Sequence, residues 1–246
     1  MEWTAPSIVL EARPYGEGDA IATVFAEAHG VYRGLARGAF SRARSAIWQA
    51  GNLLQARWVA RLEDQLGSLT AELVAQPAAL AMDDALSLAL LRAACATAEG
   101  ALPERAPHPR LFAGLVGLLA ALGHGRAPLG ELVRWEAALL ADLGYGLDLS
   151  RCALTGATGR LDYVSPRTGR AVSAAAAGVW QARLLKLPPF LLAADQDGDP
   201  AEWRDGLCLT GHFLARDAFG HHHRPLPAAR VALYERVTRL AELSHV

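Results

Sequence analysis

Residues 20–36 read Ala-Ile-Ala-Thr-Val-Phe-Ala-Glu-Ala-His-Gly-Val-Tyr-Arg-Gly-Leu-Ala, two short apolar runs on either side of a turn. The runs Ala20–Ala26 and Gly30–Ala36 contain β-branched and aromatic residues, which favour strands, and the Glu-Ala-His-Gly between them is a turn signal. This stretch therefore predicts two consecutive strands joined by a tight turn.

Three further runs of this kind lie close by in the sequence. They are Ser7–Ala12, Leu53–Val59 and Leu69–Val74, and turn signals rich in Gly, Pro and Asn separate them. Five short strands closed by small turns within about the first 75 residues favour a small barrel over a sandwich. The alternative is that the Ala-rich pieces of this region are helical.

The pattern becomes helical from Pro77 onward. Three segments each begin at a Pro and end at a Gly, an asymmetry that is typical of helices. These segments are residues 77–100, 109–123 and 128–144. We therefore expect an α+β multidomain fold, with a barrel over residues 1–76 and an all-helical domain over residues 77–246. The helical domain is interrupted by a turn-rich insertion at about residues 150–172, where Gly, Thr and Arg are frequent.

A fourth helix is expected from Pro225 to about Leu243. Apolar residues recur in it at intervals of three, which places them on one helical face. These residues are Val231, Tyr234, Val237 and Leu240. This face leaves three arginines for the exposed side of the helix, and they form a secondary set of candidate contacts to an anionic partner: Arg230, Arg236 and Arg239.

The overall composition indicates a protein of the reducing cytoplasm. The 24 basic and 25 acidic residues give a formal charge of −1, so any nucleic-acid site must come from uneven placement of charge. The 3 cysteines are widely spaced and odd in number, which argues against a disulfide framework. The N-terminus lacks the features of a signal peptide, and the longest strongly apolar stretch, Leu111–Gly123, is shorter than the roughly 18–20 residues of a membrane span. We therefore expect a cytoplasmic protein without a membrane partner.

Basic residues are concentrated in the predicted barrel. Between Ala28 and Leu62 there is no Asp or Glu but there are six arginines. They are Arg33, Arg37, Arg42, Arg44, Arg57 and Arg61. The segment 37–45 adds Gly, Phe and two Ser, the composition of a loop that follows a phosphate backbone. These six arginines are the predicted contacts to a nucleic acid or another anionic partner, and the alternative is a basic face that only contacts solvent.

Four aromatic residues of the same region have two possible roles. They are Tyr32, Phe40, Trp48 and Trp58. Each could provide a stacking surface for a nucleic-acid base or fill the barrel core. The sequence leaves both roles open.

No motif for catalysis is present. The chain contains no P-loop, no nucleophile elbow, no zinc-protease motif and no dinucleotide-binding glycine motif. We therefore expect no enzyme, no catalytic residue and no cofactor. A structural zinc site needs four ligands, commonly from Cys-x-x-Cys pairs, and Cys152 has no such partner. The run His221–His223 with Asp217 is better explained as a polar loop before Pro225, so no metal-binding residue is predicted.

Several segments carry a likeness to a known family. In the predicted barrel they are Pro14-Tyr-Gly-Glu-Gly-Asp-Ala, Val24-Phe-Ala-Glu-Ala-His-Gly and Gly34-Leu-Ala-Arg-Gly-Ala-Phe-Ser. Further along they are residues 134–152, which begin Arg-Trp-Glu and end Ser-Arg-Cys, and Tyr163-Val-Ser-Pro-Arg-Thr-Gly-Arg-Ala-Val. In this order the segments resemble the RecO family of bacterial recombination mediators and DNA repair proteins. The likeness runs almost the whole length of the chain and is most specific over residues 134–170.

The resemblance implies a fold and a function. It implies an N-terminal OB-fold barrel followed by a helical domain. It also implies binding of single- and double-stranded DNA, annealing of complementary strands, and assistance in loading recombinase onto DNA coated with single-strand-binding protein. The implied partners are DNA, the recombination protein RecR and the acidic tail of single-strand-binding protein, and the implied location is the nucleoid.

The chain departs from the family in its insertion. Some members carry four zinc-binding cysteines there, but this chain retains only Cys152, with Thr155, Ser173 and Ala176 where the other three are expected. We therefore expect a degenerate zinc-knuckle-like insertion without stoichiometric zinc.

Two other functions remain compatible with the residues alone. A basic barrel also suits an RNA-binding or ribosome-associated protein. The chain could also be a pure protein adaptor, in which the barrel is only a scaffold.

Overall fold

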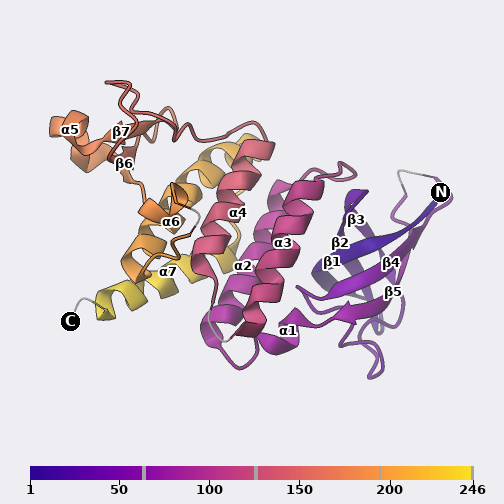
Figure 1. Ribbon diagram of the computed structural model, residues 1–246. Coiled ribbons are helices and arrows are strands. Elements are labelled where there is room, and N and C mark those ends of the chain that lie inside the picture. Colours follow the sequence, from indigo (N-terminus) through magenta and orange to yellow (C-terminus); the bar gives the residue numbers. More distant parts are fainter. Residues whose placement is uncertain (63–64, 125–126, 194, 245–246) are drawn as a thin grey trace. The chain divides into compact units, whose positions relative to one another are not determined.

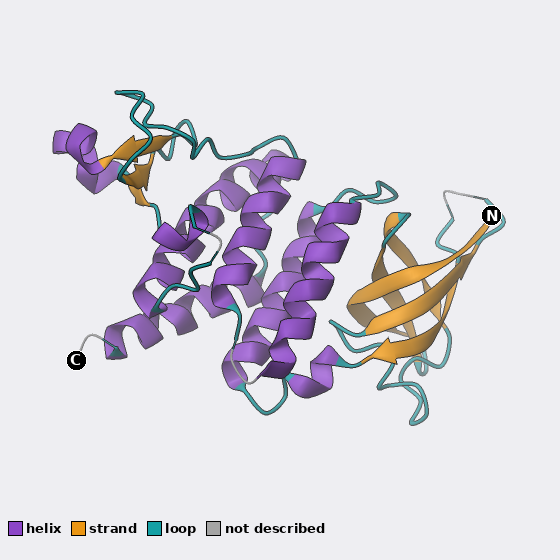
Figure 2. Ribbon diagram, viewed as in Figure 1, coloured by secondary structure: helices purple, strands orange, loops and turns teal. Residues whose placement is uncertain are grey.

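The N-terminal part of the chain forms a closed five-stranded barrel (Figures 1 and 2). The computed structural model describes residues 1–62, 65–124, 127–193 and 195–244. The strands are β1 (Glu2–Tyr15), β2 (Asp19–Ala26), β3 (Gly30–Ala36), β4 (Leu53–Val59) and β5 (Ser68–Ala75). Their order around the barrel is β1-β2-β3-β5-β4. The prediction of five strands in a barrel is confirmed, and the alternative of Ala-rich helices in this region is wrong.

The long strand β1 connects two neighbours of the barrel. Its first half pairs antiparallel with β4, from Glu2 opposite Val59 to Ile8 opposite Leu53. Its second half pairs with β2, and an irregularity between Val9 and Glu11 interrupts that register. Such a bulge bends a strand, so one strand can belong to both sides of a closed barrel. The barrel is completed by a single parallel pair, Leu35 opposite Ser68, between β3 and β5.

Trp58 fills the centre of the barrel core. It is 1% exposed, and alanines of β2 and β4 such as Ala22 and Ala56 leave room for its ring. The indole N–H donates to the carbonyl oxygen of Arg33 at 3.0 Å and of Leu66 at 3.2 Å. Gly67 has a φ of +68°, and a Cβ there would lie 2.4 Å from the indole ring. Glycine at this turn is therefore required both by the backbone conformation and by the close approach of Trp58.

Helices follow the barrel within the same compact unit, which comprises residues 1–127. They are α1 (Pro77–Leu80), α2 (Ala85–Ala101), α3 (Pro109–Ala121) and the 3-10 turn η1 (Leu122–His124). The helix expected over residues 77–100 is two helices, because the Asp84 side chain accepts hydrogen bonds from the backbone N–H groups of Leu86 and Ser87 and starts α2 there. The rings of Phe25 and Phe112 meet edge to face at 5.4 Å, which joins β2 to α3. The boundary expected between residues 76 and 77 remains a prediction, since contacts group the barrel with these helices.

The second compact unit comprises residues 128–246. Its main helices are α4 (Leu129–Asp142), α6 (Pro200–Phe213) and α7 (Ala228–Leu243). Its shorter elements are β6 (Leu161–Val164), β7 (Ala171–Ser173), α5 (Ala174–Ala177), η2 (Gly178–Arg183), β8 (Leu185–Lys186), η3 (Pro189–Leu191), η4 (Leu214–Ala218) and η5 (Gly220–His222). The insertion expected as turns over about 150–172 contains a three-stranded sheet, in the order β7-β6-β8, that continues to Lys186. None of the described helices has the length and apolar character that crossing a membrane requires.

Helix α6 was not expected from the sequence. Its start is a capping box, in which Asp199 accepts from the backbone of Glu202 at 2.9 Å and Glu202 accepts from the backbone of Asp199 at 3.2 Å. Pro200 occupies the first turn, where a missing N–H has no cost. The two glycines Gly206 and Gly211 weaken the helical pattern. The segment is nevertheless a helix, because α6 is stabilised by packing against α4 and α7.

Helix α7 buries a different face from the one predicted. The buried residues are Arg230, Leu233, Val237 and Ala241, whereas Val231 is 41% exposed. The prediction that Arg230 lies on the exposed side is wrong. It counted only apolar residues as buried, so it could not identify an arginine that enters the core with an acidic partner.

Candidate nucleic-acid interface

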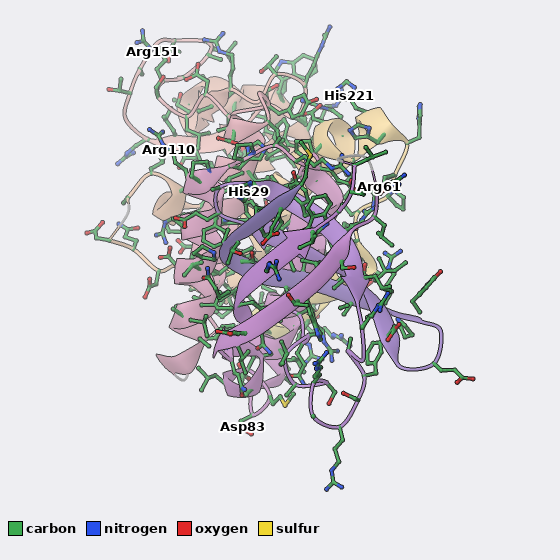
Figure 3. All side chains as sticks on the ribbon, turned by 90° about the vertical axis from the view of Figure 1, so that its right-hand side faces the viewer. His29, Arg61, Asp83, Arg110, Arg151 and His221 are labelled. Carbon is green, nitrogen blue, oxygen red and sulfur yellow. The ribbon has the colours of Figure 1, made fainter. Side chains whose placement is uncertain are left out.

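The six predicted barrel arginines lie on four different parts of the barrel, and all are exposed. Arg33 is on β3 and Arg57 is on β4. Arg37, Arg42 and Arg44 lie in the β3–β4 connection, residues 37–52. Arg61 lies in the β4–β5 connection (Figure 3), next to residues 63 and 64, which are outside the described part of the chain.

Two of these arginines are paired with carboxylates from distant parts of the sequence. Arg33 lies 2.9 Å from Glu99 and 3.0 Å from Glu104. Arg57 lies 2.7 Å from Glu2, and this hydrogen bond lowers the pKa of the Glu2 carboxyl. The stretch without acids between residues 28 and 62 therefore acquires acidic neighbours through folding, which reduces the positive charge that Arg33 and Arg57 present to a ligand.

The β3–β4 connection holds its arginines on a defined backbone. The backbone N–H of Gly38 donates to the Asp19 carboxylate at 2.7 Å, which ties the connection to the start of β2. The guanidinium of Arg44 donates to the carbonyl oxygen of Arg37 at 3.0 Å. Within the described residues, no ion pair involves Arg37, Arg42 or Arg44. These three arginines therefore present their full charge to solvent, and we call them the loop arginines.

A cavity lies between the β3–β4 connection and strand β5. It has a volume of about 180 Å³. Its lining includes Arg37, Arg44, Trp48, Ser68 and Thr70. The cavity adjoins the β3–β5 seam, where only Leu35 and Ser68 pair. Arg37, Arg44 and the hydroxyls of β5 thus place hydrogen-bond donors around one small hollow, an arrangement suited to an anionic ligand.

Most of the candidate stacking residues belong to the core. Tyr32, Trp48 and Trp58 are buried, and Tyr32 and Trp58 meet edge to face at 5.1 Å. Only Phe40, in the β3–β4 connection, is exposed. The open choice between stacking and core packing is therefore decided for core packing at three of the four positions.

The secondary set of arginines is divided by the structure. Arg236 and Arg239 are exposed on α7, but Arg230 is 1% exposed. Its guanidinium pairs with Glu136 of α4, with Nε 2.5 Å from Oε1 and Nη2 2.9 Å from Oε2. Arg230 also donates to the carbonyl oxygen of Leu207, and Thr210 donates to Glu136. Arg230 thus joins three helices of the unit instead of facing a ligand.

The residues around Cys152 do not fit a zinc ion. The Cys152 sulfur accepts from the Ser173 backbone N–H at 3.4 Å and from the Ser173 hydroxyl at 3.5 Å. Hydrogen bonds from Thr155 and Ser173 lower the pKa of the Cys152 thiol to about 6. Two of the positions where the family carries cysteines are therefore occupied by hydroxyl residues that hydrogen-bond the remaining sulfur. In the part of the chain that the structure describes, no three His, Cys, Asp or Glu residues gather as metal ligands.

His221 and His222 lie on η5 and His223 follows it, and His221 (Figure 3) stacks on Tyr145 with ring centroids 5.6 Å apart. The neighbouring Asp217 pairs with Arg216 at 2.7 Å. His221 is therefore engaged in ring stacking and Asp217 in an ion pair, and neither interaction involves a metal.

Comparison with known proteins places the chain in a family. A family model described as the N terminal part of Recombination protein O matches residues 1–77, and one for its C terminal part matches residues 82–225. Among similar proteins, the DNA repair protein RecO of Granulibacter bethesdensis is 62% identical over 98% of both chains. That of Acidiphilium cryptum is 59% identical over 97% of this chain and 96% of its own. That of Gluconacetobacter diazotrophicus is 55% identical over 98% of this chain and 96% of its own. The α+β fold with an N-terminal OB-fold barrel agrees with these matches, and the chain belongs to the RecO family.

Proposed function

We propose that this chain acts in DNA repair and recombination by binding DNA and annealing complementary strands, without catalysis of its own. Membership of the RecO family supports the general role, as does the name DNA repair protein RecO of its relatives. The observation that carries the proposal is the set of loop arginines, which are exposed and lack carboxylate partners among the described residues.

Contacts from these arginines suit the DNA backbone better than the bases. A guanidinium binds two phosphate oxygens through parallel N–H groups, and such contacts are the same for every sequence. Neutralised phosphates repel a second strand less, while the base edges stay free to pair. A protein that holds a strand in this way promotes annealing without a nucleotide cofactor.

The proposal includes three finer parts. The loop arginines with Arg61 are the principal DNA contacts on single and double strands, and Arg33 and Arg57 contribute less because Glu99, Glu104 and Glu2 neutralise them. The chain assists recombinase loading onto DNA coated with single-strand-binding protein. Its protein partners are RecR and the acidic tail of single-strand-binding protein, and its location is the nucleoid.

The test is a comparison of the full chain with the variant Arg37→Ala/Arg42→Ala/Arg44→Ala. Binding of labelled single-stranded oligonucleotides is measured by fluorescence anisotropy at several salt concentrations, and annealing is measured with complementary oligonucleotides. Each lost phosphate contact makes the slope of log affinity against log salt shallower by about 0.7. We therefore expect weaker binding and a slope shallower by about 2.

Arg13→Ala is the matched control, because Arg13 is an exposed barrel arginine that already pairs with Glu11 at 2.7 Å. Equal binding and annealing by the parent and the triple variant at about 150 mM salt would contradict the proposed contacts. Tighter binding of structured RNA than of single-stranded DNA at equal salt would favour the RNA-binding alternative. If the parent protein shows no DNA binding but still binds its protein partners, the adaptor alternative is favoured.

A further inference from the structure

A second basic surface lies on the insertion of the helical unit. Residues 149–193 contain six basic residues and a single acidic one, Asp162. The basic residues are Arg151, Arg160, Arg167, Arg170, Arg183 and Lys186. This imbalance is comparable to that of residues 28–62, which hold six arginines and no acidic residue. Figure 1 shows β6, β7 and α5 grouped together at one end of their unit.

Four of these basic residues remain without an acidic partner. All six are exposed, and Arg151 is exposed on the connection between α4 and β6 (Figure 3). Arg170 lies 3.4 Å from Asp148, and Lys186 lies 3.3 Å from Asp205. The described residues place no ion pair on the other four, Arg151, Arg160, Arg167 and Arg183. The single acid, Asp162, accepts a hydrogen bond from the backbone N–H of Ala174 at 3.1 Å.

The insertion also carries an exposed tryptophan. Of the six tryptophans in the chain only Trp180, on η2, is exposed, at 57%. The Arg183 guanidinium lies 5.4 Å from the centroid of its ring. The neighbouring Gln181 donates to the Tyr163 hydroxyl at 2.6 Å, which ties η2 to β6. A large planar ring held in solvent beside a cation offers a free face on which another planar group can stack.

The turn that carries Arg167 is also anchored. It joins β6 to β7, and its backbone carbonyl oxygens accept hydrogen bonds from η4 and the end of α6. Arg216 donates to the carbonyl oxygen of Arg167 at 3.2 Å. The Nε2 atom of His212 lies 3.0 Å from the carbonyl oxygen of Pro166. The backbone of Arg167 is therefore positioned by the helices while its side chain remains in solvent.

We propose that the insertion surface, defined as Trp180 with Arg151, Arg160, Arg167 and Arg183, binds a single strand of nucleic acid. Trp180 stacks on a base, and the arginines contact successive phosphates. A planar ring among several unpaired cations matches the alternation of bases and phosphates, and stacking on a tryptophan is independent of sequence. The inference rests on the proposed function, and it gives one chain a second DNA surface apart from the loop arginines.

Trp180 also supplies the test, since it is the one exposed tryptophan and stacking on a base quenches tryptophan fluorescence. Oligothymidylate is titrated into the full chain and into the Arg37→Ala/Arg42→Ala/Arg44→Ala variant. We expect quenching in both, because the insertion surface is intact in both. In the triple-variant background, Trp180→Ala should abolish the quenching and weaken oligonucleotide binding, measured by anisotropy, about 5- to 150-fold. Trp180→Phe keeps a stacking ring and should retain most of the affinity.

The outcomes separate this inference from the proposed function. Binding by the parent with no quenching, together with unchanged affinity on Trp180→Ala, overturns the insertion surface and leaves the loop arginines in place. Absence of oligonucleotide binding in the parent overturns both. Quenching by an acidic peptide but not by oligothymidylate shows that the surface takes a protein tail, and this also overturns the inference. Far-ultraviolet circular dichroism of each variant verifies that it is folded.

Discussion

Arg44 and Arg230 are chemically identical but lie in opposite environments. Arg44 is exposed on the barrel, and its guanidinium donates to the backbone carbonyl of Arg37 and has no ion pair with any described residue. Arg230 is buried between helices and pairs with Glu136 through two hydrogen bonds. The difference shows that the role of an arginine depends on whether the fold brings a carboxylate to it. The barrel keeps its loop arginines exposed and without an ion pair among the described residues, whereas the helical unit uses Arg230 to hold itself together.

The largest expected effect breaks the buried pair. Arg230→Ala leaves the Glu136 carboxylate buried without its partner, so we expect a loss of about 3–5 kcal/mol in the free energy of unfolding. Urea unfolding of the full chain measures it. Arg236→Ala, on the exposed side of the same helix, is the control and should change stability by less than about 0.5 kcal/mol. A small effect at Arg230 would mean that burial of the pair contributes little to the difference between the two regions.

The next effect concerns the buried thiol of Cys152, and it depends on pH. Folding lowers the pKa of this thiol from about 9 to about 6. Its contribution to stability is therefore full above the unfolded pKa and is lost as the pH falls through the folded pKa. Between pH 6 and 9 the unfolding free energy of the parent should rise relative to that of Cys152→Ala. Parallel curves for the two proteins in urea titrations would show that hydrogen bonds from Thr155 and Ser173 do not hold a thiolate.

The comparison can also be made within the barrel, between Arg44 and Arg57. Arg44→Ala should make the salt dependence of single-stranded DNA binding shallower by about 0.7, the value for one phosphate contact. Arg57→Ala should change it less, because Glu2 already neutralises Arg57. Anisotropy titrations over a series of salt concentrations measure both slopes. Equal slopes for the two variants would indicate that DNA displaces Glu2 from Arg57.

The smallest expected effect comes from removing a carboxylate. Glu2→Gln frees the Arg57 guanidinium, so DNA binding should tighten and its salt slope should steepen by at most about 0.7. The double variant Glu2→Gln/Arg57→Ala should lose that gain. If Glu2→Gln binds DNA like the parent, Arg57 lies outside the path of the strand.

The barrel was predictable because its signals are local. Strands β2, β3 and β4 match the expected ranges within a residue, since each alternates or is apolar throughout and ends at a turn. Helix α6 was missed although Asp199 and Glu202 form a capping box, because Gly206 and Gly211 obscure its periodicity. Capping chemistry would have revealed it.

The candidate site was less predictable than the fold. The density of arginines between residues 28 and 62 indicated a basic region, and the loop arginines are indeed exposed. The acidic neighbours of the barrel arginines could not be inferred. Arg33, for example, pairs with Glu99 and Glu104, which are remote from it in the sequence. The burial of Arg230 depends in the same way on Glu136, which lies 94 positions earlier. The exposed Trp180 has no local signal, because a tryptophan in sequence reads as a core residue.

The pairing of β1 with β4 also governs how the chain folds during synthesis. Glu2 lies opposite Val59, so the β4 side of β1 cannot pair until the residue 57 positions later has been synthesised. At about 5–20 residues per second, this delay lasts about 3 to 11 seconds. During that time β1, β2 and β3 can form only an open sheet, whose two edges offer unpaired backbone groups to any other strand nearby. The barrel is thus most exposed to aggregation while it is being made, before β4 and β5 arrive to close it.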